Sequence, residues 1–158
     1  MGLLPDGMAK LIGVFWFFTL LLFLLFFFYS YAAAPEQLSI SFGQPDQNVI
    51  TKETYFYLGI GLFLLTNISF YLASKLMKLR SPDKPLYFYL RQWLRSFAGL
   101  SNLFLIILLV LLGLSNSEEN FDLTHYDFLI YFGPIPLVAW LGLLVFLLFR
   151  QGSRQPVV

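Results

Sequence analysis

The sequence predicts an all-α integral membrane protein with four transmembrane helices, organised as a single domain over residues 1–158. Of its 158 residues, 58% are hydrophobic and only 12% are charged, about half the charged share of a soluble domain. The apolar residues form four blocks, each close to the roughly 20 residues that a helix needs to cross a bilayer. The blocks are Leu11–Tyr31, Tyr55–Leu76, Phe97–Leu114 and Phe128–Phe149.

The basic residues lie almost entirely on one side of the predicted membrane. Six of the ten Lys and Arg residues occupy the hinge Lys75–Arg95, between the second and third blocks. If this hinge is cytoplasmic, nine basic residues lie inside and Lys52 alone lies outside. This asymmetry is typical of the positive-inside rule. The sequence therefore predicts cytoplasmic N- and C-termini and two acidic external loops.

The hinge also has the composition of a segment that lies in the membrane interface. Beyond Pro85, aromatic rings and leucines are interleaved with arginines, and such rings prefer the headgroup level. We therefore expect a short interfacial cytoplasmic segment between the second and third helices. Nucleic acid is not expected as a partner, because no wider basic surface accompanies the run. The residues expected to contact anionic lipid headgroups are Lys78, Arg80, Lys84, Arg91, Trp93 and Arg95.

The first block is apolar on every side. Trp16 is expected near the inner interface, and Tyr29 and Tyr31 near the outer one. Because no face is marked for packing, the sequence favours a lipid-exposed anchor, with a Phe-rich face for a partner subunit as the alternative. The run is longer than the roughly 7–15 apolar residues of a signal peptide, so we expect it to be retained.

The segment between the first two blocks is a loop with recognisable order. Hydrophobic residues alternate with serines over Leu38–Phe42, which predicts a short half-buried strand. Pro45 and Asp46 then predict a turn.

This loop resembles the extracytoplasmic segment of a family of small bacterial membrane proteins, DUF1648, which is also found at the N-terminus of SdpI-type immunity proteins. The match covers less than a fifth of the chain, Ser41 stands where the family usually has His, and the spacing from Phe to Gly is compressed. The resemblance implies a bacterial plasma membrane location and an external loop that binds a peptide or toxin. The matching residues are Pro35, Leu38, Ile40, Phe42, Gly43, Pro45, Asp46 and Lys52.

Small and polar residues predict which faces of the second and third helices contact protein. In lipid, close backbone approach and interhelical hydrogen bonds hold helices together. On the second helix this stripe is Gly59, Leu62, Thr66, Ser69 and Ala73, with Asn67 beside it. On the third helix it is Ser96, Gly99, Asn102, Ile106, Leu109 and Gly113.

Asn67 and Asn102 are expected at depths that differ by only about 4–5 Å, because each lies a few residues from the hinge. The two amides are therefore expected to pair between the helices. The alternative is that Asn67 lines a ligand or transport pathway, since polar groups at membrane depth are often functional.

The fourth block contains Gly133-Pro134-Ile135-Pro136. Each proline removes a backbone donor, so we expect a kink or break, covered by protein, with Pro134 and Pro136 as partner-contact residues. The preceding acidic loop, Ser115–Asp127, holds His125 but shows no metal-ligand spacing. A solvated loop is expected there.

The functional groups of most enzymes and transporters are missing from the blocks. No His, Cys, Asp, Glu or Arg lies within them, and no phosphate-binding or nucleophile motif lies outside them. The sequence thus predicts no cofactor, metal site or catalysis. The leading hypothesis is a non-catalytic subunit or scaffold of a larger membrane complex, with lipids and other membrane subunits as partners. The alternatives are an SdpI-like immunity or sensor protein that binds a peptide through its first external loop, and a small transporter.

Overall fold

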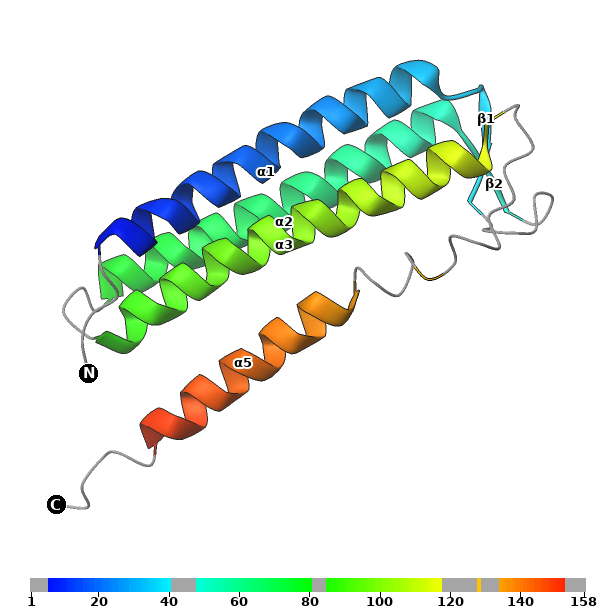
Figure 1. Cartoon of the computed structure of the whole chain (residues 1–158). Coiled ribbons are helices and arrows are strands. Elements are labelled where there is room, and N and C mark those ends of the chain that lie inside the picture. Colours follow the sequence, from blue (N-terminus) through cyan, green and yellow to red (C-terminus); the bar gives the residue numbers. More distant parts are fainter. Residues whose placement is uncertain (1–5, 41–47, 81–84, 118–127, 129–133, 153–158) are drawn as a thin grey trace, which may run out of the picture.

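The computed structural model describes residues 6–40, 48–80, 85–117, 128 and 134–152. Figure 1 shows three long helices side by side as a bundle, with a small hairpin at one end. Two of these helices, α1 and α3, run in the same direction, and α2 runs in the opposite one (Figure 1). A further helix, α5, lies beside α3 and apart from α1 and α2. The elements are α1 (Asp6–Ala33), β1 (Gln37–Ser39), β2 (Val49–Thr51), α2 (Lys52–Arg80), α3 (Pro85–Ser115) and α5 (Pro134–Gly152).

Three of the predicted spans are confirmed as helices that are long and apolar enough to cross a membrane. They cover Gly7–Ala33, Lys52–Leu79 and Leu86–Ser115. With 31 residues, α3 is about 45 Å long, so it extends beyond a hydrocarbon core of about 30 Å.

The interfacial segment predicted between the second and third helices is continuous with the third, because Pro85–Arg95 forms the first turns of α3 itself. Proline is well suited to the first position of a helix, where its missing N–H leaves no bond unmade. The Leu, Arg and Gln residues that follow have high helix propensity, so nothing interrupts the helix before the predicted span begins.

The fourth predicted span is not confirmed. The described apolar stretch of α5, Pro134–Phe146, is shorter than the other three. Pro134 and Pro136 lie in the first turn of α5, where backbone N–H groups have no partner within the helix. Among the described residues the two prolines therefore begin a helix and do not interrupt one. Near the start of the predicted span, residues 129–133, with Gly133, lie outside the described residues.

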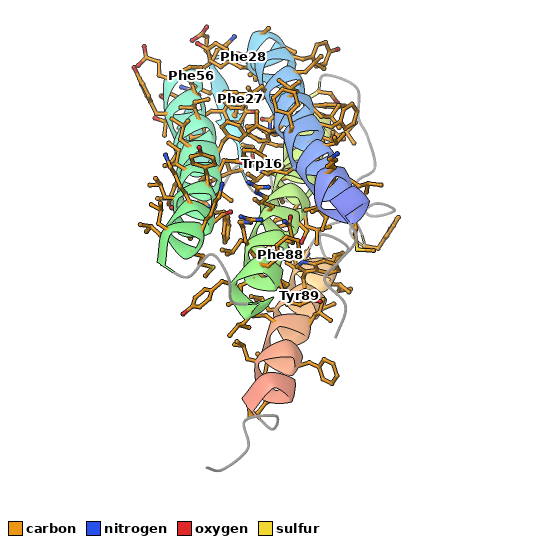
Figure 2. The ribbon with its side chains drawn as sticks, turned by 90° about the vertical axis from the view of Figure 1, so that its left-hand side faces the viewer. Trp16, Phe27, Phe28, Phe56, Phe88 and Tyr89 are labelled. Atoms are coloured by element: carbon orange, nitrogen blue, oxygen red, sulfur yellow. The ribbon has the colours of Figure 1, made fainter. Side chains whose placement is uncertain are left out.

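The core of the bundle is a column of aromatic and aliphatic side chains where α1, α2 and α3 meet. Phe23 and Phe27 of α1 are fully buried, and Phe23 stacks on Phe63 of α2 with ring centroids 4.6 Å apart. Ile106 and Leu109 of α3 complete the column. Figure 2 shows Phe27 projecting from α1 into the space between α1 and α2. The prediction of a lipid-exposed anchor is thus wrong for this face of α1, although its opposite face is exposed.

The hairpin closes one end of this core. Strand β1 pairs antiparallel with β2, so that Leu38 lies opposite Ile50. Leu38 is buried against the aromatic column, as predicted. The strand is shorter than the predicted one, since β1 ends at Ser39 and Ile40, expected on the same face as Leu38, is exposed. Helix α2 follows β2 directly, and the Thr51 hydroxyl caps it by accepting a hydrogen bond from the Thr54 N–H at 3.2 Å. The predicted turn at Pro45 and Asp46, together with Phe42 and Gly43, lies outside the described residues.

Candidate functional site

The hairpin is fixed to α3 by one side chain, Asn116, which the sequence analysis did not identify. Its Oδ1 accepts a hydrogen bond from the Ser39 N–H at 2.7 Å, and its Nδ2 donates to the Ser39 carbonyl at 2.8 Å. One amide thereby pairs with both backbone groups of a strand residue, as a neighbouring strand would. Nδ2 also donates to the Leu112 carbonyl at 2.9 Å, which fixes the amide on the end of α3.

Lys52 fixes the other side of the hairpin to α1. Its Nζ donates to the Ala34 carbonyl at 2.8 Å and lies 5.3 Å from the centre of the Tyr31 ring. A cation is favourable at this position, because carbonyl groups at a helix C-terminus carry partial negative charge. The backbone N–H of Lys52 also donates to the Glu36 carbonyl at 3.0 Å. The lysine that stands apart from the basic hinge is therefore a structural contact.

Between these two anchors, an open groove of about 370 Å³ lies at the hairpin end of the bundle, between α1 and α3. Its walls are mainly apolar and include Phe26 of α1, Leu109 and Val110 of α3, and Leu38 of the hairpin. Gly113 also lines it and is exposed, with nothing within 4 Å of the point where a Cβ would lie. The prediction that Gly113 packs against another helix is therefore wrong within this chain. The absence of its side chain leaves room in the groove.

Hydroxyl and amide groups lie at the hairpin end of the groove. Ser30 shares a hydrogen bond of 2.8 Å with the Tyr55 hydroxyl, and Ser117 donates to the Leu114 carbonyl at 2.9 Å. A hydroxyl oxygen that donates one bond can still accept others. The groove therefore combines apolar walls with a few polar groups at one end, as binding pockets for small ligands commonly do.

A second polar cluster lies inside the bundle, where the sequence analysis expects the two asparagines to meet. Asn67 Nδ2 donates to Asn102 Oδ1 at 2.8 Å, and Asn102 Nδ2 donates back to Asn67 Oδ1 at 3.2 Å. Trp16 of α1 adds a third partner, since its Nε1 donates to Asn67 Oδ1 at 3.1 Å. These bonds join all three helices, and no described side chain of the cluster is left to act on a ligand.

The stripe of small and polar residues predicted on α2 lies about one residue away from the residues of α2 that pack against the other helices. Ser69 and Leu62 are exposed, and Thr66 and Ala73 are only partly buried. Gly59 does contact α1, because a Cβ added there would collide with the Phe27 ring. The buried side chains of α2 are Tyr55, Phe63, Asn67 and Ser74.

The stripe on α3 lies where the sequence predicts it over most of its length. Ser96, Asn102, Ile106 and Leu109 are buried. Gly99 is buried too, and a Cβ there would collide with the Phe15 ring of α1. Glycine at this position permits the close approach of α1 to α3.

Trp93 was expected at the lipid headgroups but is buried against α5. Its Nε1 donates to the Trp140 carbonyl at 2.9 Å, and Trp140 Nε1 donates to the Ser96 hydroxyl at 3.0 Å. Both indole N–H groups are thus satisfied in a contact between helices. This contact lies in the first half of α3, near the basic end of the bundle.

The other described residues expected at the headgroups lie toward the end of the bundle opposite the hairpin. Lys78 is exposed, and Arg91 and Arg95 are partly buried. The Arg91 guanidinium lies 5.4 Å from the centre of the Phe88 ring. Arg80 is the last residue of α2. Lys84 and residues 118–127 of the acidic loop, with His125, lie outside the described residues.

Among the described residues, no group of three or more His, Cys, Asp or Glu side chains could hold a metal ion. Comparison with protein-family models, with curated proteins and with solved structures finds no match for this chain. The resemblance of the first loop to SdpI-type proteins therefore stays a prediction from the residues that carry it.

Proposed function

We propose that this chain is a non-catalytic membrane protein that binds the apolar segment of an extracytoplasmic peptide in the groove beside its hairpin. The observation that supports this proposal is the groove itself. Its volume of about 370 Å³ falls in the range of small-ligand pockets, and its apolar walls end in a few polar groups. The SdpI-like loop resemblance points to the same external hairpin and to the same class of ligand.

The groove is preorganised, which favours binding. Asn116 holds β1 from α3, and Lys52 holds the start of α2 against the end of α1. A loop that is already ordered loses little conformational freedom when a ligand binds. Asn116 also occupies the outer edge of β1 at Ser39, where an added peptide strand would have to pair. Recognition by the groove is therefore favoured over recognition by strand addition.

The charge distribution supports an orientation with the hairpin outside a bacterial plasma membrane and both termini in the cytoplasm. Among the described residues, Lys10, Lys75 and Lys78 lie toward the end opposite the hairpin, as do Arg91 and Arg95. Basic residues are retained on the cytoplasmic side.

Cysteine labelling tests this orientation in a chain that has no native cysteine. An impermeant maleimide added to intact cells should label Ser117→Cys, beside the groove, and leave Lys78→Cys unlabelled until the cells are permeabilised. Labelling of Lys78→Cys in intact cells would reverse the orientation.

Photocrosslinking tests the groove. A photoreactive benzoylphenylalanine at Val110, a partly exposed groove residue, should form adducts with a peptide that mass spectrometry identifies. Gly113→Phe should remove these adducts by filling the groove, since nothing lies within 4 Å of the Cβ position there. The matched control is Gly61→Phe, at an exposed glycine of α2 with equally open surroundings, and it should leave the adducts unchanged. Adducts with phospholipid alone, in the parent and in both variants, would show that the groove is an ordinary lipid-facing surface.

A second candidate function, as a subunit of a larger membrane complex, is favoured by α5. No described side chain of α5 is buried, and Trp140 joins it to the bundle by hydrogen bonds with Trp93 and Ser96. A partner that packs on this helix should co-elute in a fixed ratio after mild-detergent purification. Elution of the chain alone, at the mass of a single copy, would count against this function.

A further inference from the structure

The basic end of the bundle contains a group of polar side chains that the proposed peptide groove does not use. Arg91 and Arg95 lie one helical turn apart on α3, and Gln92 lies three residues before Arg95. Side chains three and four residues apart are neighbours on a helix surface, so Arg95 adjoins both of the others.

Two atoms of this group are buried and lack a partner. The Nε of Arg91 and the Oε1 of Gln92 have no hydrogen bond, and the Gln92 side chain is only 2% exposed. Buried polar groups normally find a partner, because an unmade hydrogen bond leaves the full cost of desolvation. An unsatisfied donor and an unsatisfied acceptor on consecutive residues favour a ligand that can both accept and donate hydrogen bonds.

The two arginines are like charges that lie close together. Arg95 is close enough to Arg91 for the two guanidiniums to repel one another. Glu36 and Glu53 lie at the opposite end of the bundle, whereas Asp6 begins α1 at the same end as the arginines. Two partly buried like charges are costly at membrane depth, and an anion between them would offset their repulsion.

The side chains of the group can reach the headgroup layer of a bilayer. Arg91 lies six residues, or about 9 Å, from the start of α3 at Pro85, and Arg95 lies about 15 Å from it. A headgroup layer is about 5–8 Å thick on each side of the hydrocarbon core, so Arg91 lies close to its inner boundary. Arg95 lies deeper, but helical side chains point toward the N-terminus of the helix, so its long side chain extends toward the headgroups. The Arg91 guanidinium lies 5.4 Å from the centre of the Phe88 ring, and a guanidinium that contacts an aromatic ring can still bind a phosphate through its N–H groups.

We propose that Arg91, Gln92 and Arg95 form a binding site for one anionic phospholipid whose headgroup carries free hydroxyls, of the phosphatidylglycerol type. The two guanidiniums bind the phosphodiester, and a headgroup hydroxyl donates to Gln92 Oε1. The site refines the broader headgroup prediction, because Trp93 faces α5 and takes no part in it. It does not depend on the peptide groove at the other end of the bundle.

Native mass spectrometry of the full chain in detergent tests the site, with phosphatidylglycerol and phosphatidylcholine as probes. We expect one phosphatidylglycerol per chain and no comparable retention of phosphatidylcholine. Arg91→Gln with Arg95→Gln should weaken this binding by about tenfold or more, since each basic residue near an anionic membrane contributes about 1 kcal/mol. The matched control, Lys75→Gln with Lys78→Gln, removes the same charge from exposed positions on α2 and should retain the lipid. Equal losses in the two double variants would overturn the proposal, because they would show attraction by general surface charge.

Gln92→Leu separates a headgroup site from a phosphate site. It should lower binding of phosphatidylglycerol and leave binding of phosphatidic acid, which lacks the headgroup hydroxyls, unchanged. Unchanged phosphatidylglycerol binding by Gln92→Leu would contradict the assigned role of the amide. Free glycerol phosphate should fail to displace the lipid at matched concentration, and effective displacement would show that the site takes a soluble anion.

Circular dichroism of each variant establishes that it is folded. If Arg91→Gln with Arg95→Gln does not fold, lysine at both positions keeps the charge but not the paired N–H edges. That variant should bind phosphatidylglycerol less tightly than the parent, and parent-like binding would count against the guanidinium geometry.

Discussion

The bundle of α1, α2 and α3 and the separate helix α5 are built from the same kind of residues, yet they bury them very differently. In the bundle, Phe23, Phe27 and Asn102 are almost completely enclosed. In α5, no described side chain is buried. Lipid solvates an apolar side chain as well as a protein interior does, so hydrophobicity alone does not bring helices together in a membrane. The bundle must therefore contain features that α5 lacks.

Two features distinguish the bundle: close approach at glycine, and polar side chains that meet between helices. Gly59 receives the Phe27 ring, and Gly99 receives the Phe15 ring. In α5, Gly142 has nothing within 4 Å of its Cβ position. Hydrogen bonds between side chains join all three bundle helices, whereas α5 is bonded to α3 through the two tryptophans and Ser96.

The largest expected effect comes from filling a glycine contact. Gly59→Ala should lower the free energy of unfolding by about 1–3 kcal/mol, because the added methyl overlaps a Phe27 ring that is fully buried and cannot move aside. Gly61→Ala, two residues away on the exposed side of the same helix, should leave stability unchanged. Unfolding in mixed detergent measures both variants. Equal stability of the two would show that close approach at Gly59 does not hold the bundle together.

Asn116→Ala should have a more local effect, no larger than that of Gly59→Ala. It removes two hydrogen bonds to Ser39, each worth about 0.5–1.5 kcal/mol, and frees β1 from α3. Hydrogen exchange should accelerate at the hairpin amides and stay unchanged in the middle of α2 and α3. The control Ser117→Ala removes a neighbouring side chain whose donated bond stays within its own turn. If exchange rises along the whole of α3, Asn116 stabilises the helix and does not act as a hairpin anchor.

The hydrogen bonds between Asn67 and Asn102 are expected to contribute less to the free energy of unfolding than the two contacts above. Interhelical hydrogen bonds within a membrane average about 0.6 kcal/mol, with a maximum of about 1.7. Asn67→Leu and Asn102→Leu should each reduce stability, and the double variant should cost less than the sum, because either change breaks the same pair of bonds. Asn67→Leu should be the more harmful, since it also leaves Trp16 without its partner. Strict additivity would mean that the two amides are not coupled.

The sequence alone predicts the features that follow from the length of an apolar block or from the depth of a residue in the membrane. Block length predicts α1, α2 and α3, and counting residues from the hinge places Asn67 and Asn102 at one level. Contacts between residues that lie far apart in the chain cannot be read from the sequence. Asn116 meets Ser39 across 77 positions, and nothing in the spacing of either residue marks the contact.

The errors on α1 and α2 have a common cause. The search for packing faces used small and polar residues as markers, but α1 packs through a row of phenylalanines in a helix that is apolar all round. A stripe of one apolar residue type among others produces no periodic signal. On α2 the same rule selected Ser69, which is exposed, in place of Phe63, which is buried. Rings that fit over glycine, more than runs of small residues, mark these interfaces.

The smallest expected effect comes from Pro134 and Pro136, and it tests whether α5 is a distinct helix at all. In the first turn of a helix a proline removes an N–H that has no partner within the helix, so replacing both residues by Ala should restore no backbone bond. We therefore expect the double variant to match the parent in stability, in insertion and in the contact of Trp140 with Trp93. Fluorescence of the indoles reports that contact, since both N–H groups are bonded there.

A clear gain in stability and helix content from the double alanine variant would contradict this expectation. It would mean that the prolines interrupt a longer helix, as the four-span prediction requires, because an internal proline costs about 3 kcal/mol. Pro85→Ala provides the matched control, since this proline also opens a helix, α3, in the same chain. If the double variant gains stability and Pro85→Ala does not, α5 belongs to a complete fourth span and its isolation from the bundle is a consequence of the break.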